Sequence, residues 1–153
     1  MNIRYGLRAC LLWLACSAGL AGAAEPGLAG TVKVSDGTVT IVRGNTILQA
    51  PVGTEVRIGD RVKTGAGASA GITFLDDTRL SLGSESTLLI NEFSFNTTSH
   101  EGGMLASFLK GTFSVVTGLL AKHSPGSVNF KTPTSTLGIR GTEFVVDVEG
   151  KDD

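Results

Sequence analysis

Short runs of alternating apolar and polar residues fill most of the chain after residue 30. These runs are rich in Val, Thr and Ile, and Gly, Asp, Asn or Pro separate them. β-branched residues favour strands, and a strand that buries one face has a hydrophobic period of two. The pattern therefore predicts an all-β domain of short strands, with no helix longer than two turns. Its loose recurrence favours a solenoid-like β-roll or β-helix, and a β-sandwich is the alternative.

Turn residues divide this pattern into individual elements. Asp36-Gly37 separates Val32 and Val34 from Val39 and Ile41, which predicts a β-hairpin, because Asp-Gly readily supplies the positive φ of a tight turn. Further turns are expected at Arg43-Gly44-Asn45, at Asp76-Asp77 and in the polar loop 96–103. The pattern predicts separate strands at Leu88 to Ile90 and at Phe93 to Phe95. Residues 104–109 fit a strand or one helical turn, and residues 117–124 fit a turn or a short helix.

The first 24 residues have the layout of a secretory signal peptide. Arg4 and Arg8 precede an apolar run, and the small residues Ala21-Gly22-Ala23 follow it. We therefore expect cleavage after Ala23 or Ala24 and an all-β domain over residues 25–153. An uncleaved anchor is the alternative, but a spanning helix needs about 20 apolar residues, more than this run contains.

The two cysteines of the chain, Cys10 and Cys16, both lie in this segment. Leu14-Ala15-Cys16 also resembles a lipobox, which makes a lipid anchor on Cys16 the less favoured alternative to a free periplasmic domain. After cleavage the domain contains no cysteine, so it cannot hold a disulfide or a thiolate-based metal site.

The charge of the exported region argues against nucleic acid as a partner. Removal of Arg4 and Arg8 leaves 11 of the 13 Lys and Arg against all 14 Asp and Glu, a net charge of −3 with both signs interspersed. The basic stripe that binds phosphate backbones is therefore absent. Tyr5 and Trp13 also lie in the signal segment, so the domain lacks the aromatic types that suit sugar-binding surfaces.

Few residues of the domain carry reactive chemistry. Asp60, Asp76 and Asp77 could supply oxygen ligands to Ca²⁺, but Asp is also a common turn residue, and we favour the turn. His100 and His123 are the two histidines, and neither has an Asp, Glu or Cys cluster at metal-ligand spacing, so we interpret both as solvated loop residues. The sequence predicts no catalytic residue, no metal site and no cofactor.

Two segments rich in Gly and Thr are the most distinctive parts of the chain. They run from Gly59 to Gly65 and from Thr132 to Phe144. Small residues and turn formers at these spacings indicate tight turns and close backbone contacts. Arg140 is expected to hold such a turn through Glu143 or nearby carbonyls. The residues assigned to this structural motif are Gly59, Asp60, Thr64, Gly65, Asp76, Thr132, Pro133, Arg140, Gly141 and Thr142.

In this order the segments resemble the periplasmic FecR domain. The matching segments are Gly30–Val34, Gly59–Gly65, Ile72–Leu82, Lys110–Phe113 and Thr132–Phe144. The resemblance implies a module that receives a signal through protein contact, from an outer-membrane receptor in the family's regulators. Those regulators also carry a cytoplasmic region that controls a sigma factor. Only eight residues precede the apolar run here, so an anti-sigma role is not expected.

We therefore expect a periplasmic, non-enzymatic module for protein interaction or signal reception. Its partner would be an unknown envelope protein, an outer-membrane receptor or a surface protein among the candidates. Phe144, Val146 and Val148 mark a strand that could lie at a sheet edge and accept a partner's strand. A self-associating envelope scaffold and a Ca²⁺- or ligand-binding β-module are the alternatives.

Overall fold

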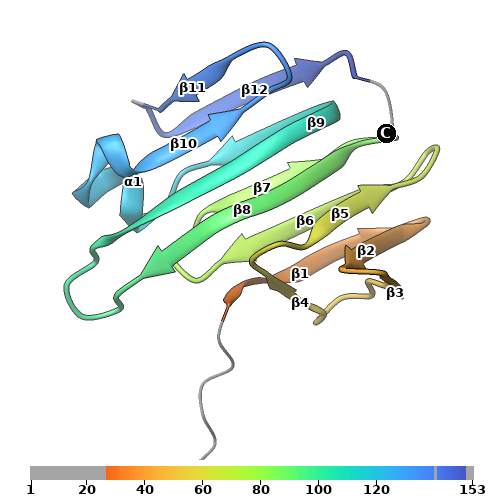
Figure 1. Ribbon diagram of the computed structural model, residues 1–153, viewed down its shortest axis with the longest axis horizontal. Helices are drawn as coiled ribbons and strands as arrows, with labels where there is room; N and C mark the ends of the chain where they lie inside the picture. Colours follow the sequence, from red (N-terminus) through yellow and green to blue (C-terminus); the bar gives the residue numbers. More distant parts are fainter. Residues whose placement is uncertain (1–26, 140, 151–153) are drawn as a thin grey trace, which may run out of the picture.

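The all-β prediction is confirmed in the computed structural model, which describes residues 27–139 and 141–150 (Figure 1). The predicted signal peptide with Cys10 and Cys16, and Arg140, lie outside the described residues. The strands are β1 Leu28–Asp36, β2 Val39–Arg43, β3 Thr46–Gln49, β4 Glu55–Arg57, β5 Arg61–Thr64, β6 Ser69–Phe74, β7 Arg79–Leu82, β8 Thr87–Phe95, β9 Gly102–Val116, β10 Val128–Lys131, β11 Thr136–Gly138 and β12 Glu143–Val148. The short helix α1 Leu119–His123 and the 3₁₀ turn η1 Pro125–Ser127 join β9 to β10.

The strands form a curled sheet in which the long strand β9 belongs to two sets of neighbours. One set runs β4-β1-β6-β7-β9-β12, and the other runs β3-β2-β5-β8-β9-β10-β11. Every pair is antiparallel except β9 with β10. The parallel stacked coils of a β-helix are therefore not what the described residues form, and the solenoid-like detail of the prediction is not confirmed. Both sets bury their apolar faces in one core.

Gly111 allows β9 to take part in both sets. Met104, Ala106 and Phe108 are buried on the first half of the strand, whereas Phe113 and Val115 are buried on the second. The buried positions change from even to odd at Gly111, which has φ +99°. This backbone conformation is open to glycine but strained for other residues. The irregular residue shifts the alternation of inward and outward side chains by one position, so both halves of β9 present apolar side chains to the same core.

A second irregularity explains why β8 reads as two strands in the sequence. Leu88 and Ile90 are buried at even positions and Phe93 at an odd one. The register with β9 shifts between Ile90 and Glu92, so Asn91 is a bulge within one continuous strand.

The hairpin predicted at Asp36-Gly37 is wrong. β1 pairs with β4 and β6, and β2 pairs with β3 and β5, so the turn carries the chain from one set of strands to the other. Alternation and turn chemistry indicate where strands begin and end, but they do not say which strands pair. The expected turns at Gly44-Asn45 and Asp76-Asp77 do close hairpins, and so does the polar loop after β8.

Phenylalanines fill the core where the two sets meet. The Phe108 ring lies 4.3 Å from Phe113 and 5.0 Å from Phe130, both nearly parallel to it, measured between ring centroids. Phe144 of β12 meets Phe130 edge-on at 5.5 Å. Stacked and edge-on pairs add about 0.5–1.5 kcal/mol each beyond the area they bury. This chain of rings joins β9, β10 and β12 into one packed unit.

Candidate functional site

Asp60 is a structural anchor and not an open metal ligand. Its side chain is 1% exposed, and its carboxylate accepts two hydrogen bonds from Arg43, from Nε at 2.8 Å and from a terminal nitrogen at 2.7 Å. The backbone N–H of Arg57 donates a third at 2.8 Å. The turn between β4 and β5 is thereby fixed to the end of β2. The sequence gives no direct sign that Arg43 plays this part, because the pair is 17 residues apart.

Asp76 fixes the start of α1 to the turn between β6 and β7. Its buried carboxylate accepts hydrogen bonds from the Thr78 hydroxyl at 2.7 Å and from the N–H of Leu120 at 3.3 Å. The Asp76 carbonyl oxygen accepts a further bond from the N–H of Leu119 at 2.7 Å. Two of the N–H groups that a helix leaves unpaired at its start are satisfied in this way. The turn interpretation of Asp76 therefore extends to a contact more than 40 residues away.

Thr64 holds β5 to the loop before β8. Its hydroxyl donates to the Gly83 carbonyl at 2.6 Å and accepts from the Ser86 N–H at 2.9 Å. The adjacent Gly65 donates its N–H to the Thr38 carbonyl at 2.9 Å. Residues near both ends of the segment Gly59–Gly65 therefore hold neighbouring turns and strands together.

The segment Thr132–Phe144 lies around β11 and the start of β12. Thr132 and Ser135 close the turn that contains Pro133, through a backbone bond of 2.8 Å. Thr117 donates its N–H to the Thr142 carbonyl at 2.9 Å and its hydroxyl to the Gly141 carbonyl at 2.8 Å. The motif residues that the structure describes are therefore distributed over several turns and do not converge on one site.

The structure brings the two histidines together, which the sequence did not indicate. The His100 and His123 ring centroids are 4.8 Å apart, and His100 stacks on Phe95 at 6.0 Å. His123 ends α1, and His100 lies in the loop between β8 and β9. No group of three or more His, Cys, Asp or Glu that could hold a metal occurs within residues 27–139 and 141–150.

β12 lies at an edge of the sheet, as the predicted partner strand requires. It pairs with β9 on one side and with no strand of the described chain on the other. Phe144 and Val146 are partly buried against the core and Val148 is buried, whereas Val145 is 67% exposed. The three apolar residues named from the sequence therefore hold the strand in place. A partner would meet its backbone and its exposed face.

Hydrogen-bond alternation shows which backbone groups of β12 face outward. The Thr117 N–H bonds to the Thr142 carbonyl, and the register continues with Phe144 opposite Val115. In an antiparallel pair, successive residues point their N–H and C=O alternately toward and away from the neighbouring strand. The groups of Glu143, Val145 and Asp147 therefore point toward the free edge.

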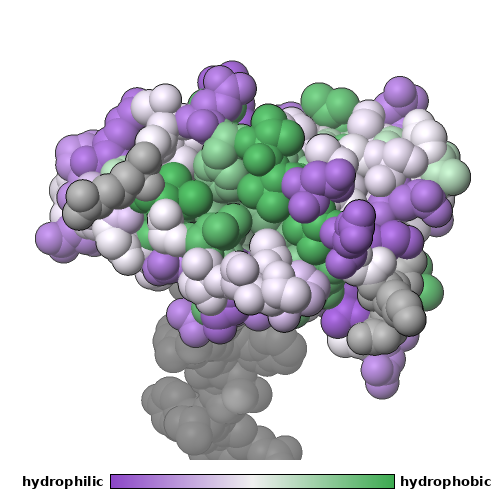
Figure 2. Space-filling view, turned by 90° about the horizontal axis from the view of Figure 1, so that it is seen from above, coloured by the Kyte–Doolittle hydropathy of each residue, from purple (hydrophilic) through white to green (hydrophobic). Residues whose placement is uncertain are grey.

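Apolar side chains gather beside this edge. Figure 2 looks onto the side of the molecule that carries β11 and β12, and it shows an apolar area framed by polar side chains. Leu137 and Ile139, from β11 and the residue after it, are partly buried against the core together with Phe144 and Val146. β11 bonds only to β10 among the described strands. The two sets of strands therefore both end here.

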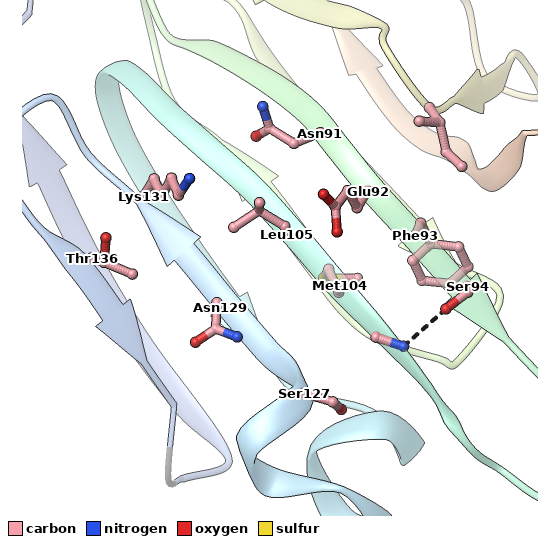
Figure 3. Close-up of a pocket in the computed structure, with 12 residues that line it drawn as sticks. Asn91, Glu92, Phe93, Ser94, Met104, Leu105, Ser127, Asn129, Lys131 and Thr136 are labelled. Atoms are coloured by element: carbon pink, nitrogen blue, oxygen red, sulfur yellow. Dashed lines mark hydrogen bonds between the residues drawn. The ribbon is translucent and has the colours of Figure 1, made fainter.

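An open groove lies on the outer face of β8, β9, β10 and β11 (Figure 3). Its volume is about 540 Å³. Leu105 lies between Glu92 and Lys131 in this view, and Asn91 and Asn129 stand beside them. Gly103, which donates its N–H to the Ser94 hydroxyl at 3.1 Å, adds no side chain to fill the hollow. The groove has an apolar floor, and its rim carries side-chain amides, the acidic Glu92 and the basic Lys131.

Comparison with known proteins identifies the family. A family model described as FecR protein matches residues 60–153. The chain belongs to the FecR family. The match begins at the buried Asp60 and includes β12, whereas the Gly30–Val34 segment of the predicted resemblance precedes it. No curated protein and no solved structure matches the FecR chain. Within its described residues, no helix has the length and apolar character needed to cross a membrane.

Proposed function

We propose that this FecR protein is an exported, non-enzymatic module that receives a signal in the periplasm by binding an envelope protein. The observation that carries the proposal is the free edge of β12, which lies inside the region that matches the family. A sheet edge with unpaired N–H and C=O groups can accept an extended segment of another protein as an additional strand. The apolar area beside the edge would add contact surface for the same partner.

A matched pair of proline variants tests this function. Proline has no N–H, and it is tolerated at an edge strand where that N–H faces solvent. Val145→Pro would remove a donor from the middle of the β12 edge. Ile47→Pro is the control, because β3 is also an edge strand and Ile47 is 70% exposed, close to the 67% of Val145.

The assay compares the proteins recovered from envelope extract by wild type and by each variant, after equal folding of all three has been verified by circular dichroism. We expect a specific partner that binds wild type and Ile47→Pro but not Val145→Pro. Recovery of the same partner by Val145→Pro would show that β12 is not the contact strand. Failure of wild type to recover any specific partner would count against the function itself.

A self-associating scaffold is the second candidate, because the apolar area beside β11 and β12 could equally pack against another copy. Analytical ultracentrifugation separates the candidates. A discrete oligomer that forms without any other protein favours the scaffold, and a monomer over the accessible concentration range favours the partner-binding module. The groove of Figure 3 gives the ligand-binding alternative a location, but its composition does not select a ligand class.

A further inference from the structure

We infer that the strand accepted by β12 is a basic one, with Lys or Arg on both sides of an apolar residue. This inference rests on the proposed function and specifies the chemistry of the partner. It follows from the three residues that line the free edge, Glu143, Val145 and Asp147, all of which are exposed.

The exposed face of β12 carries negative charge at both ends. Glu143 and Asp147 lie on either side of Val145 on that face, and the exposed Glu149 follows the strand. The Asp147 carboxylate accepts a hydrogen bond from the Thr112 hydroxyl at 3.2 Å, which holds it on this face. Lys110 lines a hollow together with Asp147 and Glu149, so one cation adjoins one end of this acidic edge.

At the positions directly opposite the edge residues, β9 supplies no charge, and Arg79 lies one strand further away on β7, where it pairs with Val116. The residues of β9 opposite Glu143, Val145 and Asp147 are Val116, Ser114 and Thr112, none of which is charged. An added strand would place its own side chains directly opposite the three edge residues on the other side. Opposite charges at such cross-strand positions stabilise pairing by about 0.2–1 kcal/mol each, and like charges destabilise it.

This charge pattern also disfavours a second copy of β12 as the added strand. If two copies pair antiparallel about Val145, Glu143 of each faces Asp147 of the other. If they pair about Val146, Glu143 faces Glu149, and Val145 faces Asp147. Both of these registers bring carboxylates together, so like charges oppose symmetric pairing centred on Val145 or Val146. A partner with lysine or arginine at the outer positions relieves the same repulsion.

Two synthetic peptides test the inference. The first has the central sequence Lys-Thr-Val-Thr-Lys, which presents lysine to both carboxylates in either strand direction because it is palindromic. The second has glutamate in place of both lysines. Binding is followed by NMR titration of the backbone amides of β12, a method that detects weak complexes.

We expect the lysine peptide to bind at least about 2- to 30-fold more tightly than the glutamate peptide, because two attractive cross-strand charge pairs alone give this range and the like charges of the glutamate peptide widen it. The preference should reverse in Glu143→Lys/Asp147→Lys. The control variant Asp36→Lys/Glu101→Lys changes the net charge by the same amount at exposed positions outside β12, and it should keep the wild-type preference. Loss of the preference in the control would show general electrostatic attraction, which overturns the inference.

The Val145→Pro variant distinguishes an error in the inferred basic partner from an error in the proposed function. If Val145→Pro abolishes peptide binding but the two peptides bind wild type with equal affinity, strand addition to β12 is supported and the inference of a basic partner is wrong. If neither peptide perturbs β12 in wild type at millimolar concentration, and Val145→Pro recovers the same envelope proteins, the proposed function of this edge fails as well. A wild-type dimer in ultracentrifugation that Val145→Pro abolishes also overturns the inference.

Discussion

Replacement of Gly111 by alanine tests the role of this residue in letting one strand serve two sets of neighbours. A Cβ atom at this position would lie 2.5 Å from the Ser86 Cα and 2.6 Å from its Cβ, and closer still to its hydroxyl oxygen. The first two atoms belong to the backbone and the base of the side chain, so rotation of the serine cannot relieve the overlap. The residue also has φ +99°, where a side chain is strained.

The expected loss in the free energy of unfolding has two parts that can be measured separately. A non-glycine residue in a positive-φ conformation costs about 1–3 kcal/mol. Overpacking a tightly packed site typically adds about 1–3 kcal/mol. Gly53→Ala is the matched control, because Gly53 has φ +95° but a Cβ there would meet nothing within 4 Å. Gly111→Ala should therefore lower the free energy of unfolding by about 2–6 kcal/mol, and Gly53→Ala by the backbone part alone.

Urea unfolding of the two variants and wild type, followed by circular dichroism, measures both losses. A difference of 1 kcal/mol corresponds to roughly 3–6 °C in Tm for a domain of this size, so thermal melts provide a second measurement. If Gly111→Ala loses no more stability than Gly53→Ala, the overlap with Ser86 is relieved elsewhere and the proposed role of Gly111 is wrong.

Three further predictions concern buried groups. Arg43→Met should destabilise the domain by about 2–4 kcal/mol, because the buried Asp60 carboxylate loses two of its hydrogen bonds. Adding Asp60→Asn should recover part of that loss, and a double-mutant cycle from urea melts would measure the recovery. Asp76→Ala should cost about 1–3 kcal/mol and speed hydrogen exchange in α1 relative to β9, whereas equal exchange would contradict its anchoring role. Phe108→Ala should cost about 3–5 kcal/mol by calorimetry, and the exposed Ile47→Ala less than 1, so similar losses would show that the ring stack is not the centre of the core.

The strand content of the fold could be predicted because each strand buries one face. Val62 and Thr64, or Leu80 and Leu82, alternate as buried positions, and the sequence shows that period directly. The segment after β9 was also correctly expected to be a turn or short helix, which is α1. Strand pairing was less predictable, because hydrogen bonds between strands depend on contacts that local composition does not encode. The turn at Asp36-Gly37 shows this most clearly.

The sequence names the residues expected to hold turns, but it does not indicate which groups they bond to. The structure places Asp60 and Asp76 at turns, whereas Arg43 and α1, which bond to them, lie too far along the chain to be linked to them by spacing. The signal that could have indicated Gly111 was present in the sequence, since the apolar positions change phase across it. The charge pattern of β12 was also present. Its meaning required the structure, which shows that Glu143 and Asp147 face outward at an edge.

The pairing of β9 with strands of both sets has a consequence for how this protein folds. Four strands, β7, β8, β10 and β12, hydrogen-bond to it, and the last of them ends at Val148. One set of strands is complete only when β11 has formed, at Gly138, and the other only when β12 has formed, at Val148; if the protein is exported as proposed, both segments must first leave the translocation channel. Loop closure over such sequence distances slows folding, so partly emerged chains expose unpaired strands for longer than a local meander would. We expect the domain to acquire its structure in one late, all-or-none step.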